Sequence, residues 1–212
     1  MKARLLFGML ATLLVAVAPA SADSIGVFGT GLTTTGALGA PGAVDPHYTL
    51  TTNPAGGGTS AFVTTGSGFP FPPWVPNGPN SQWITPNTSQ LNHPAGTYTY
   101  VTTFDLTGLI PGTAVLTGAW GTDNPGQMFL NGVLVSTSSG FTSLTAFLIS
   151  SGFLPGVNTL TFVIENLPQA TGNPSGLRVD ISGTASPVPE PSTLLLLGSG
   201  MAGLWLRRRL RA

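Results

Sequence analysis

Residues 97–106, Thr-Tyr-Thr-Tyr-Val-Thr-Thr-Phe-Asp-Leu, alternate between apolar and polar side chains and decide the fold class. A period of two places one set on a core-facing side and the other in water, which predicts a half-buried β-strand. The apolar or aromatic face carries Tyr98, Tyr100, Phe104 and Leu106, and the polar face carries Thr97, Thr99, Thr103 and Asp105.

The same alternation recurs at residues 159–165 and 177–182, so each of these segments also has one wet face. Strands with one wet face are typical of an antiparallel sandwich. Asn131-Gly132 lies between two apolar runs and predicts a β-hairpin. With further short strands, the chain is predicted to be all-β, an antiparallel β-sandwich of jelly-roll type. These further strands are expected near residues 25–28, 48–51, 61–64, 114–120 and 144–149.

Residues 69–86 do not fit a sheet, because their prolines remove the N–H donors that a strand ladder needs. Aromatic residues remain among these prolines, so the segment is predicted to be an ordered loop or a cover over the sandwich.

Only 7% of the 212 residues are charged, against about 25% in ordinary soluble domains. This scarcity argues against a helical bundle, which needs charged residues on its surface. The formal net charge is zero, but the basic residues gather at the two ends of the chain. Residues 23–187 hold one basic and six acidic residues, a formal charge of −5. No basic patch is available for nucleic acid, so no nucleic-acid partner is expected.

The first 22 residues have the pattern of a secretory signal peptide. Lys2 and Arg4 form a charged start, an apolar run from 5 to 17 follows, and Ala20 and Ala22 frame a small-residue cleavage site. Signal peptidase and the general secretion machinery are therefore expected partners. The chain has no cysteine, so its core must hold the exported domain without disulfides.

The last residues of the chain follow a three-part order: a proline-rich linker, an apolar stretch and a basic cluster. Pro189-Glu190-Pro191 precedes the apolar residues 193–206, and arginines dominate residues 207–212. The apolar stretch is predicted to be a single transmembrane helix with its arginines in the cytoplasm.

This tail resembles the PEP-CTERM sorting signal, which is also labelled an ice-binding-protein C-terminal domain, over residues 188–211. In that family, exosortase, a membrane protease, recognises the Pro-Glu-Pro tripeptide and removes the helix. The resemblance therefore implies that the protein is an exosortase substrate, passing through the inner membrane to the cell envelope surface or extracellular matrix. It leaves open whether the processed protein is released or attached again.

Residues 97–184 resemble the galactose-binding-like sandwiches that serve as carbohydrate-binding modules beside glycosidases. The similarity rests on the strand at 97–106 and on three later motifs, which concern turns and core positions. They are Trp120-Gly-Thr-Asp-Asn124, Leu130-Asn-Gly132 and Gly156-Val-Asn-Thr-Leu160.

These observations predict five parts of the chain. They are a signal peptide at 1–22, a β-sandwich domain at 23–184, a proline-rich linker with the sorting motif at 185–192, the transmembrane helix at 193–206 and a basic tail at 207–212.

Catalytic chemistry finds little support in the residues, and no enzyme activity is expected. Glycoside hydrolysis needs two carboxylates across one cleft, but the acidic residues lie on wet strand faces or in turns. The two histidines are isolated from any candidate nucleophile. The acidic residues considered are Asp105, Asp123, Glu165 and Asp180, and the histidines are His47 and His93.

No cofactor is expected, although Asp123-Asn124 offers the oxygen ligands that a structural Ca²⁺ prefers, with Asp45, Asp180 or backbone carbonyls as further donors. The competing interpretation is that Asp123 and Asn124 only cap their own turn.

Sugar recognition would use aromatic faces against pyranose rings, with polar side chains holding the hydroxyls. The candidates are Trp74, Trp83, Trp120 and Arg178. The competing interpretation is that the tryptophans pack in the core and that Arg178 pairs with Asp180 or Glu165 across a solvent-exposed strand face.

Two functional hypotheses remain. The first is a non-catalytic, exported surface or matrix protein that binds or organises exopolysaccharide, as in a biofilm. The alternative is a structural surface or biofilm protein with no discrete ligand.

Overall fold

The computed structural model describes residues 21–138, 140–189 and 193–210. The predicted signal peptide, apart from its last two residues, lies outside this range. In chain order the elements are β1 (Asp23–Ser24), β2 (Val44–Thr52), β3 (Ser60–Val63), β4 (Ile84–Thr85), β5 (Gly96–Asp105), the 3-10 turn η1 (Pro111–Thr113), β6 (Val115–Asp123), β7 (Gly126–Leu130), β8 (Val133–Ser138), β9 (Thr145–Ile149), β10 (Val157–Asn166), β11 (Gly176–Ala185) and α1 (Thr193–Arg209).

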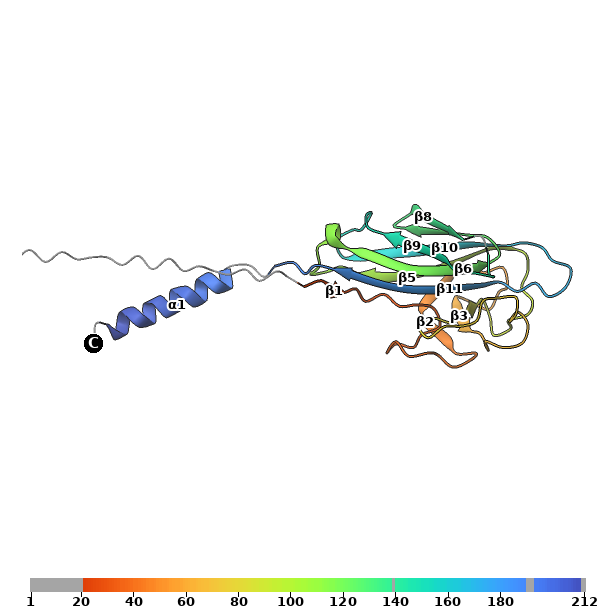
Figure 1. The fold of residues 1–212 in the computed structure, drawn as a ribbon, viewed down its shortest axis with the longest axis horizontal. Helices are drawn as coiled ribbons and strands as arrows, with labels where there is room; N and C mark the ends of the chain where they lie inside the picture. The colour runs from red at the N-terminus through yellow and green to blue at the C-terminus, as the bar shows by residue number, and fades with distance from the viewer. Residues whose placement is uncertain (1–20, 139, 190–192, 211–212) are drawn as a thin grey trace, which may run out of the picture.

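The described strands form one continuous antiparallel path, which folds into two facing layers (Figure 1). The order along the path is β8-β7-β10-β5-β2-β3-β4-β11-β6-β9, and β1 pairs with β11 beside it. We call β8-β7-β10-β5-β2 the front sheet and β4-β11-β6-β9 the back sheet, with β3 joining them. From β5 onward the chain passes repeatedly between the two sheets, as in a jelly roll.

The core lies between the two sheets and is built around large aromatic side chains. Trp120 of the back sheet packs edge-on against Phe162 of the front sheet, with ring centroids 5.6 Å apart. Tyr48 contacts the same Phe162 ring at 6.0 Å. All three side chains are fully buried. The structure is therefore an antiparallel β-sandwich of jelly-roll type, as the alternating pattern predicts.

The strand predictions hold for the strongly patterned segments. The strand expected at 97–106 is β5, and those expected at 159–165 and 177–182 lie within β10 and β11. Asn131-Gly132 turns the β7–β8 hairpin with positive φ angles of 50° and 83°, as such a turn requires.

Two weaker strand predictions differ from the structure. Residues 25–28 are not a strand: the strand register with β11 ends at Ser24, and the N–H of Ile25 adds one further bond to the carbonyl of Gly183. Within the proline-rich segment, Ile84–Thr85 forms the short strand β4, which bridges β3 and β11. The rest of that segment forms no strand, as its prolines predict.

The start of the predicted linker is attached to the sandwich. The N–H of Ile110 donates to the carbonyl of Ser186 at 2.8 Å, and the N–H of Val188 donates to the carbonyl of Gly108 at 2.8 Å. β1 pairs with the end of β11 nearby, with Asp23 opposite Ala185. The two ends of the sandwich domain thus lie side by side, at the end of the molecule from which the tail extends (Figure 1).

The predicted C-terminal helix is present as α1. Among the described residues, no helix is long and apolar enough to cross a membrane. The last turn of α1 carries Arg207, Arg208 and Arg209.

Candidate functional site

The three tryptophans proposed from the sequence as sugar platforms are buried. Trp74 is 2% exposed, and Trp83 and Trp120 are 0% exposed. A pyranose ring needs an open aromatic face, so the prediction that these rings stack on a sugar is wrong for this structure. The competing interpretation, that they pack in the interior, is the one that the structure supports.

Trp74 and Trp83 fasten the proline-rich segment to the sandwich. Their ring centroids lie 4.3 Å apart. The indole N–H of Trp74 donates to Oδ2 of Asp123 at 2.8 Å, and that of Trp83 donates to the carbonyl of Val75 at 2.8 Å. The prolines bend the loop over the sheet, and the tryptophans supply the apolar area that holds it there.

Arg178 has a similar structural role, because the same loop covers it. It is 5% exposed, its Nε donates to Oγ of Ser81 at 3.0 Å, and its guanidinium also donates to the carbonyl of Pro76. Burial lowers the pKa of Arg178, and the charge of Asp180 opposes that effect. The sequence pattern places Arg178 on a solvent-exposed strand face, but the proline-rich loop covers that face and buries the side chain.

Asp123 and Asn124 form a closed hydrogen-bonded turn between β6 and β7. Oδ1 of Asp123 accepts a bond from Nδ2 of Asn124 at 2.6 Å, and Oδ1 of Asn124 accepts one from the N–H of Leu167 at 2.8 Å. Burial raises the pKa of Asp123 to about 6, opposed by the bond from Trp74. Within the described ranges no three His, Cys, Asp or Glu residues gather as a metal site. The side-chain oxygens of Asp123 and Asn124 thus accept hydrogen bonds from the protein itself, both within the turn and from distant segments.

A small cavity, which we call the loop-end pocket, brings Trp74 and Asp123 together at one end of the sandwich. Its volume is about 120 Å³, below the range of about 300–1,000 Å³ that is usual for ligand sites. The half-exposed Phe69 lies at its edge. The lining consists of Phe69, Pro70, Pro73, Trp74, Asp123, Phe141, Gln169, Gly172 and Pro174.

A larger depression of about 400 Å³, which we call the sheet-face groove, lies on the outer side of the front sheet. The strand register builds it from outward-facing positions: Thr97 lies opposite Glu165, and Gln127 lies opposite both Val163 and Thr137. The side chains of Thr97, Gln127, Thr137 and Glu165 are exposed. The groove is lined by Thr97, Pro125, Gly126, Gln127, Thr137, Ser138, Val163 and Glu165.

The sequence did not predict this groove, although its alternating pattern already placed two of the lining residues on polar strand faces. The alternation already assigns Thr97 and Glu165 to wet faces, but a wet strand face is usually only solvated surface. Gln127 and Thr137 come from a hairpin whose partner strand could not be read from local spacing. Only the pairing of β5, β10, β7 and β8 brings the four side chains to one place.

The other sequence-predicted acids lie apart from the groove. Asp105 is at the opposite end of β5 from Thr97, where its Oδ1 accepts bonds from the N–H and hydroxyl of Thr107. Asp180 lies on the back sheet. Asp45 is buried, and its carboxylate accepts N–H bonds from Gly31, His47 and Tyr48.

Residues 187–210 match the family model described as the PEP-CTERM protein-sorting motif. The chain ends in a PEP-CTERM sorting motif. This motif implies an exported protein that is sorted to the cell envelope or surface, and it implies processing by the membrane protease exosortase. Pro189 is exposed, while Glu190 and Pro191 lie outside the described residues. At the other end of the chain Ala22 is exposed and Ala20 lies outside the described range.

No curated protein matches the chain in sequence. Among solved structures it is similar to a β-glucuronidase from Ruminococcus gnavus, with 18% identity and a TM-score of 0.33, over 44% of this chain. The match spans 20% of that enzyme. A family 35 carbohydrate-binding module from Paenibacillus barcinonensis has 19% identity and a TM-score of 0.32, over 66% of this chain and 92% of the module. A family 29 module complexed with mannohexaose has 11% identity and a TM-score of 0.32, over 65% of this chain and 90% of the module.

Proposed function

We propose that this PEP-CTERM protein is a non-catalytic surface or matrix protein that binds exopolysaccharide through the sheet-face groove. The sorting motif supports its export, and the groove supports the binding role. Signal peptidase, the secretion machinery and exosortase are its proposed processing partners.

The observation that carries the proposal is the size and lining of the groove. At about 400 Å³ it lies within the usual range for small-molecule sites. Thr97, Thr137 and Gln127 offer donors and acceptors, and Glu165 offers two acceptor oxygens, which suits the hydroxyls of a sugar. Val163 and Pro125 add a small apolar contact for the ring edges.

The position of the groove fits a surface-attached protein. Thr97 and Asp105 lie near opposite ends of β5. They are eight residues apart, which is about 26 Å along a strand. The loop after Asp105 carries Gly108, which bonds the linker at Val188. The groove therefore lies at the end of the front sheet away from the tail, where a polysaccharide can reach it.

The arrangement of carboxylates supports a binding role over hydrolysis. Glycosidases place two carboxyl groups about 5–9.5 Å apart across the substrate. Within the described chain, the lining of the groove includes one carboxylate, Glu165. Asp123 is buried in the neighbouring loop-end pocket, where both of its oxygens already accept hydrogen bonds.

The second candidate function is a structural surface protein without a discrete ligand. The exposed threonines on the front sheet, such as Thr49, Thr51 and Thr103, favour it, since they make a neutral, solvated face that needs no ligand.

Substitutions inside the groove, with a threonine control outside it, separate the two functions. Thr97 and Thr103 are both exposed on β5, but only Thr97 lines the groove. In an affinity-gel screen of neutral and charged polysaccharides, we expect Gln127→Ala combined with Thr97→Ala to weaken binding about tenfold, the loss of one or two hydrogen bonds. Thr103→Ala should bind like wild type. Absence of retardation by every polysaccharide would favour the structural function.

A further inference from the structure

Resting on the proposed function, we infer that the sheet-face groove selects glycans bearing free amino groups and disfavours acidic ones. The juxtaposition that carries this inference is an exposed carboxylate in a neutral polar groove, on a domain surface without exposed lysine or arginine.

The sandwich exposes no lysine or arginine between residues 21 and 189. Arg178 is the single lysine or arginine between residues 21 and 189. It is 5% exposed and bonds Ser81 and Pro76 beneath the proline-rich loop. A uronate or sulfate on a polysaccharide therefore finds no lysine or arginine on the described sandwich, and binding it would leave a desolvated anion without a partner.

Glu165 contributes the carboxylate that lines the groove. Its side chain is exposed at the end of β10, directly opposite Thr97 of β5. Its backbone is held by two bonds, since its N–H donates to the carbonyl of Pro125 and its carbonyl accepts from the N–H of Asn124. Among the described residues its carboxylate has no hydrogen-bond or ion-pair partner, so a ligand can use both oxygens.

The polar neighbours of Glu165 in the groove offer neutral hydrogen-bonding groups. Thr97, Gln127, Thr137 and Ser138 are uncharged and have hydroxyl or amide groups that suit sugar hydroxyls. An ammonium group beside Glu165 gains a charge-assisted hydrogen bond, which is stronger than a neutral one. Because the site is open to water, we expect a preference of about fivefold over the N-acetylated sugar.

The test compares two oligosaccharides that share one backbone. A glucosamine hexamer and its N-acetylated counterpart are titrated calorimetrically into the purified full-length protein, with polygalacturonate as the acidic probe. We expect the free amine to bind about fivefold more tightly than the N-acetylated form, and polygalacturonate to bind least. Glu165→Gln should bring the two hexamers to equal affinity.

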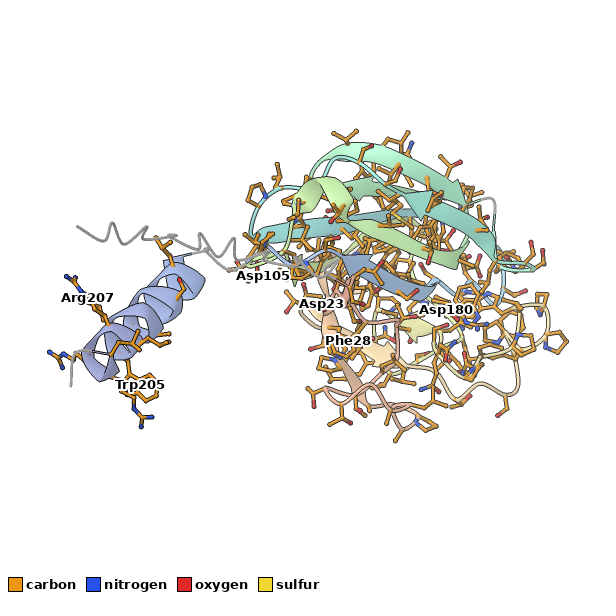
Figure 2. The ribbon with its side chains drawn as sticks, turned by 60° about the vertical axis from the view of Figure 1, so that its left-hand side comes forward. Asp23, Phe28, Asp105, Asp180, Trp205 and Arg207 are labelled. Atoms are coloured by element: carbon orange, nitrogen blue, oxygen red, sulfur yellow. The ribbon has the colours of Figure 1, made fainter. Side chains whose placement is uncertain are left out.

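Asp105→Asn is the matched control. Asp105 is exposed at the far end of the same sheet, on the side of the sandwich that faces α1 in Figure 2, and the substitution removes one negative charge just as Glu165→Gln does. Equal losses in both variants would mean a diffuse charge effect and would overturn the inference, as would a preference that survives in Glu165→Gln. Binding of the N-acetylated hexamer without preference for the amine overturns this inference alone. Absence of binding by any glycan overturns the proposed function as well.

Discussion

Each buried tryptophan keeps a hydrogen-bond partner for its indole nitrogen. Trp74 uses Asp123, Trp83 uses the carbonyl of Val75, and Trp120 uses Oγ of Ser136 at 3.0 Å. Burying an indole N–H without a hydrogen bond would cost the free energy of its desolvation. These partners offset that cost, so the large side chains can be fully buried. Substituting Trp74 therefore removes packing of the loop, and a loss of binding in such a variant would report on folding.

His93 is also held in one hydrogen-bonded state. Its Nδ1 accepts from the N–H of Ser175 at 2.9 Å, and its Nε2 lies 3.0 Å from the carbonyl of Ser89. Because a carbonyl only accepts, Nε2 carries the proton and the ring is neutral. Burial lowers the pKa of His93 to about 4, and the bond to Ser89 opposes this shift.

The two shifted groups predict opposing pH effects on stability. The pKa of His93 falls from 6.5 to about 4 on folding. The free energy of unfolding therefore decreases as the pH falls from 6.5 to about 4, because only the unfolded chain takes up the proton readily. The pKa of Asp123 rises from 3.8 to about 6 on folding. The free energy of unfolding therefore decreases as the pH rises from 3.8 to about 6, because the folded protein holds the proton more tightly than the unfolded chain. Each effect amounts to about 3 kcal/mol, and in wild type the two largely cancel between pH 4 and 6.

Asp123→Asn should remove one of these opposing effects. We expect the free energy of unfolding of this variant, from urea titrations, to fall by about 3 kcal/mol more than wild type between pH 6 and pH 4. Comparing how the free energy of unfolding changes with pH in the two proteins removes any pH-independent loss of stability that the substitution causes. Parallel pH profiles for the two proteins would contradict the assignment to Asp123.

At the scale of elements, two asparagines connect the β7–β8 hairpin to the β9–β10 loop. Nδ2 of Asn131 donates to Oδ1 of Asn158 at 2.8 Å, and Oδ1 of Asn131 accepts from the N–H of Thr159 at 3.0 Å. Asn158 also accepts from the N–H of Leu154 and donates to the carbonyls of Leu154 and Gly156. Two turn motifs that are separate in the sequence thus meet through one amide network.

Removing the centre of this network should be costly. Asn158 is fully buried, so Asn158→Ala leaves several polar groups unpaired, and we expect a loss of about 2–4 kcal/mol in the free energy of unfolding. Asn80→Ala, at an exposed position, should change it by less than about 0.5 kcal/mol. Urea unfolding of both variants measures this, and similar values for the two would show that the network does not hold the loops.

At the scale of the whole molecule, the sorting tail and the proposed binding groove lie at opposite ends of the sandwich. The tail leaves the sandwich beside β1, while the sheet-face groove lies at the other end of the β5–β10 pair. Residues up to Val188 are bonded to the sandwich, and Pro189 is exposed. The start of the tripeptide is therefore accessible without disturbing the sandwich.

The tail should be processed independently of the groove. We expect Glu190→Ala in the native host to accumulate as a species that keeps the mass of its tail, detected by mass spectrometry, with less protein at the surface. Ser192→Ala, beside the tripeptide, and Glu165→Gln, in the groove, should be processed like wild type. Normal removal of the tail in Glu190→Ala would contradict the role of the tripeptide.

The sequence alone determined the features that depend on neighbouring residues. Alternation at 97–106 predicts β5, Asn131-Gly132 predicts its hairpin, and Pro189-Glu190-Pro191 with its flanks predicts the sorting motif. Each of these signals is local, because strand period, turn geometry and a linear motif depend on residues close together in the chain.

Only the tertiary structure decided which polar strand faces remain exposed to solvent and which outward-facing side chains line the sheet-face groove. Arg178 and Glu165 both lie at polar positions of alternating strands, yet the proline-rich loop covers Arg178 and leaves Glu165 open. The tryptophans that resemble a sugar platform in the sequence are the anchors of that loop. Burial depends on contacts between segments distant in sequence, here loop against β11 and β5 against β10, and local spacing carries no information about such contacts.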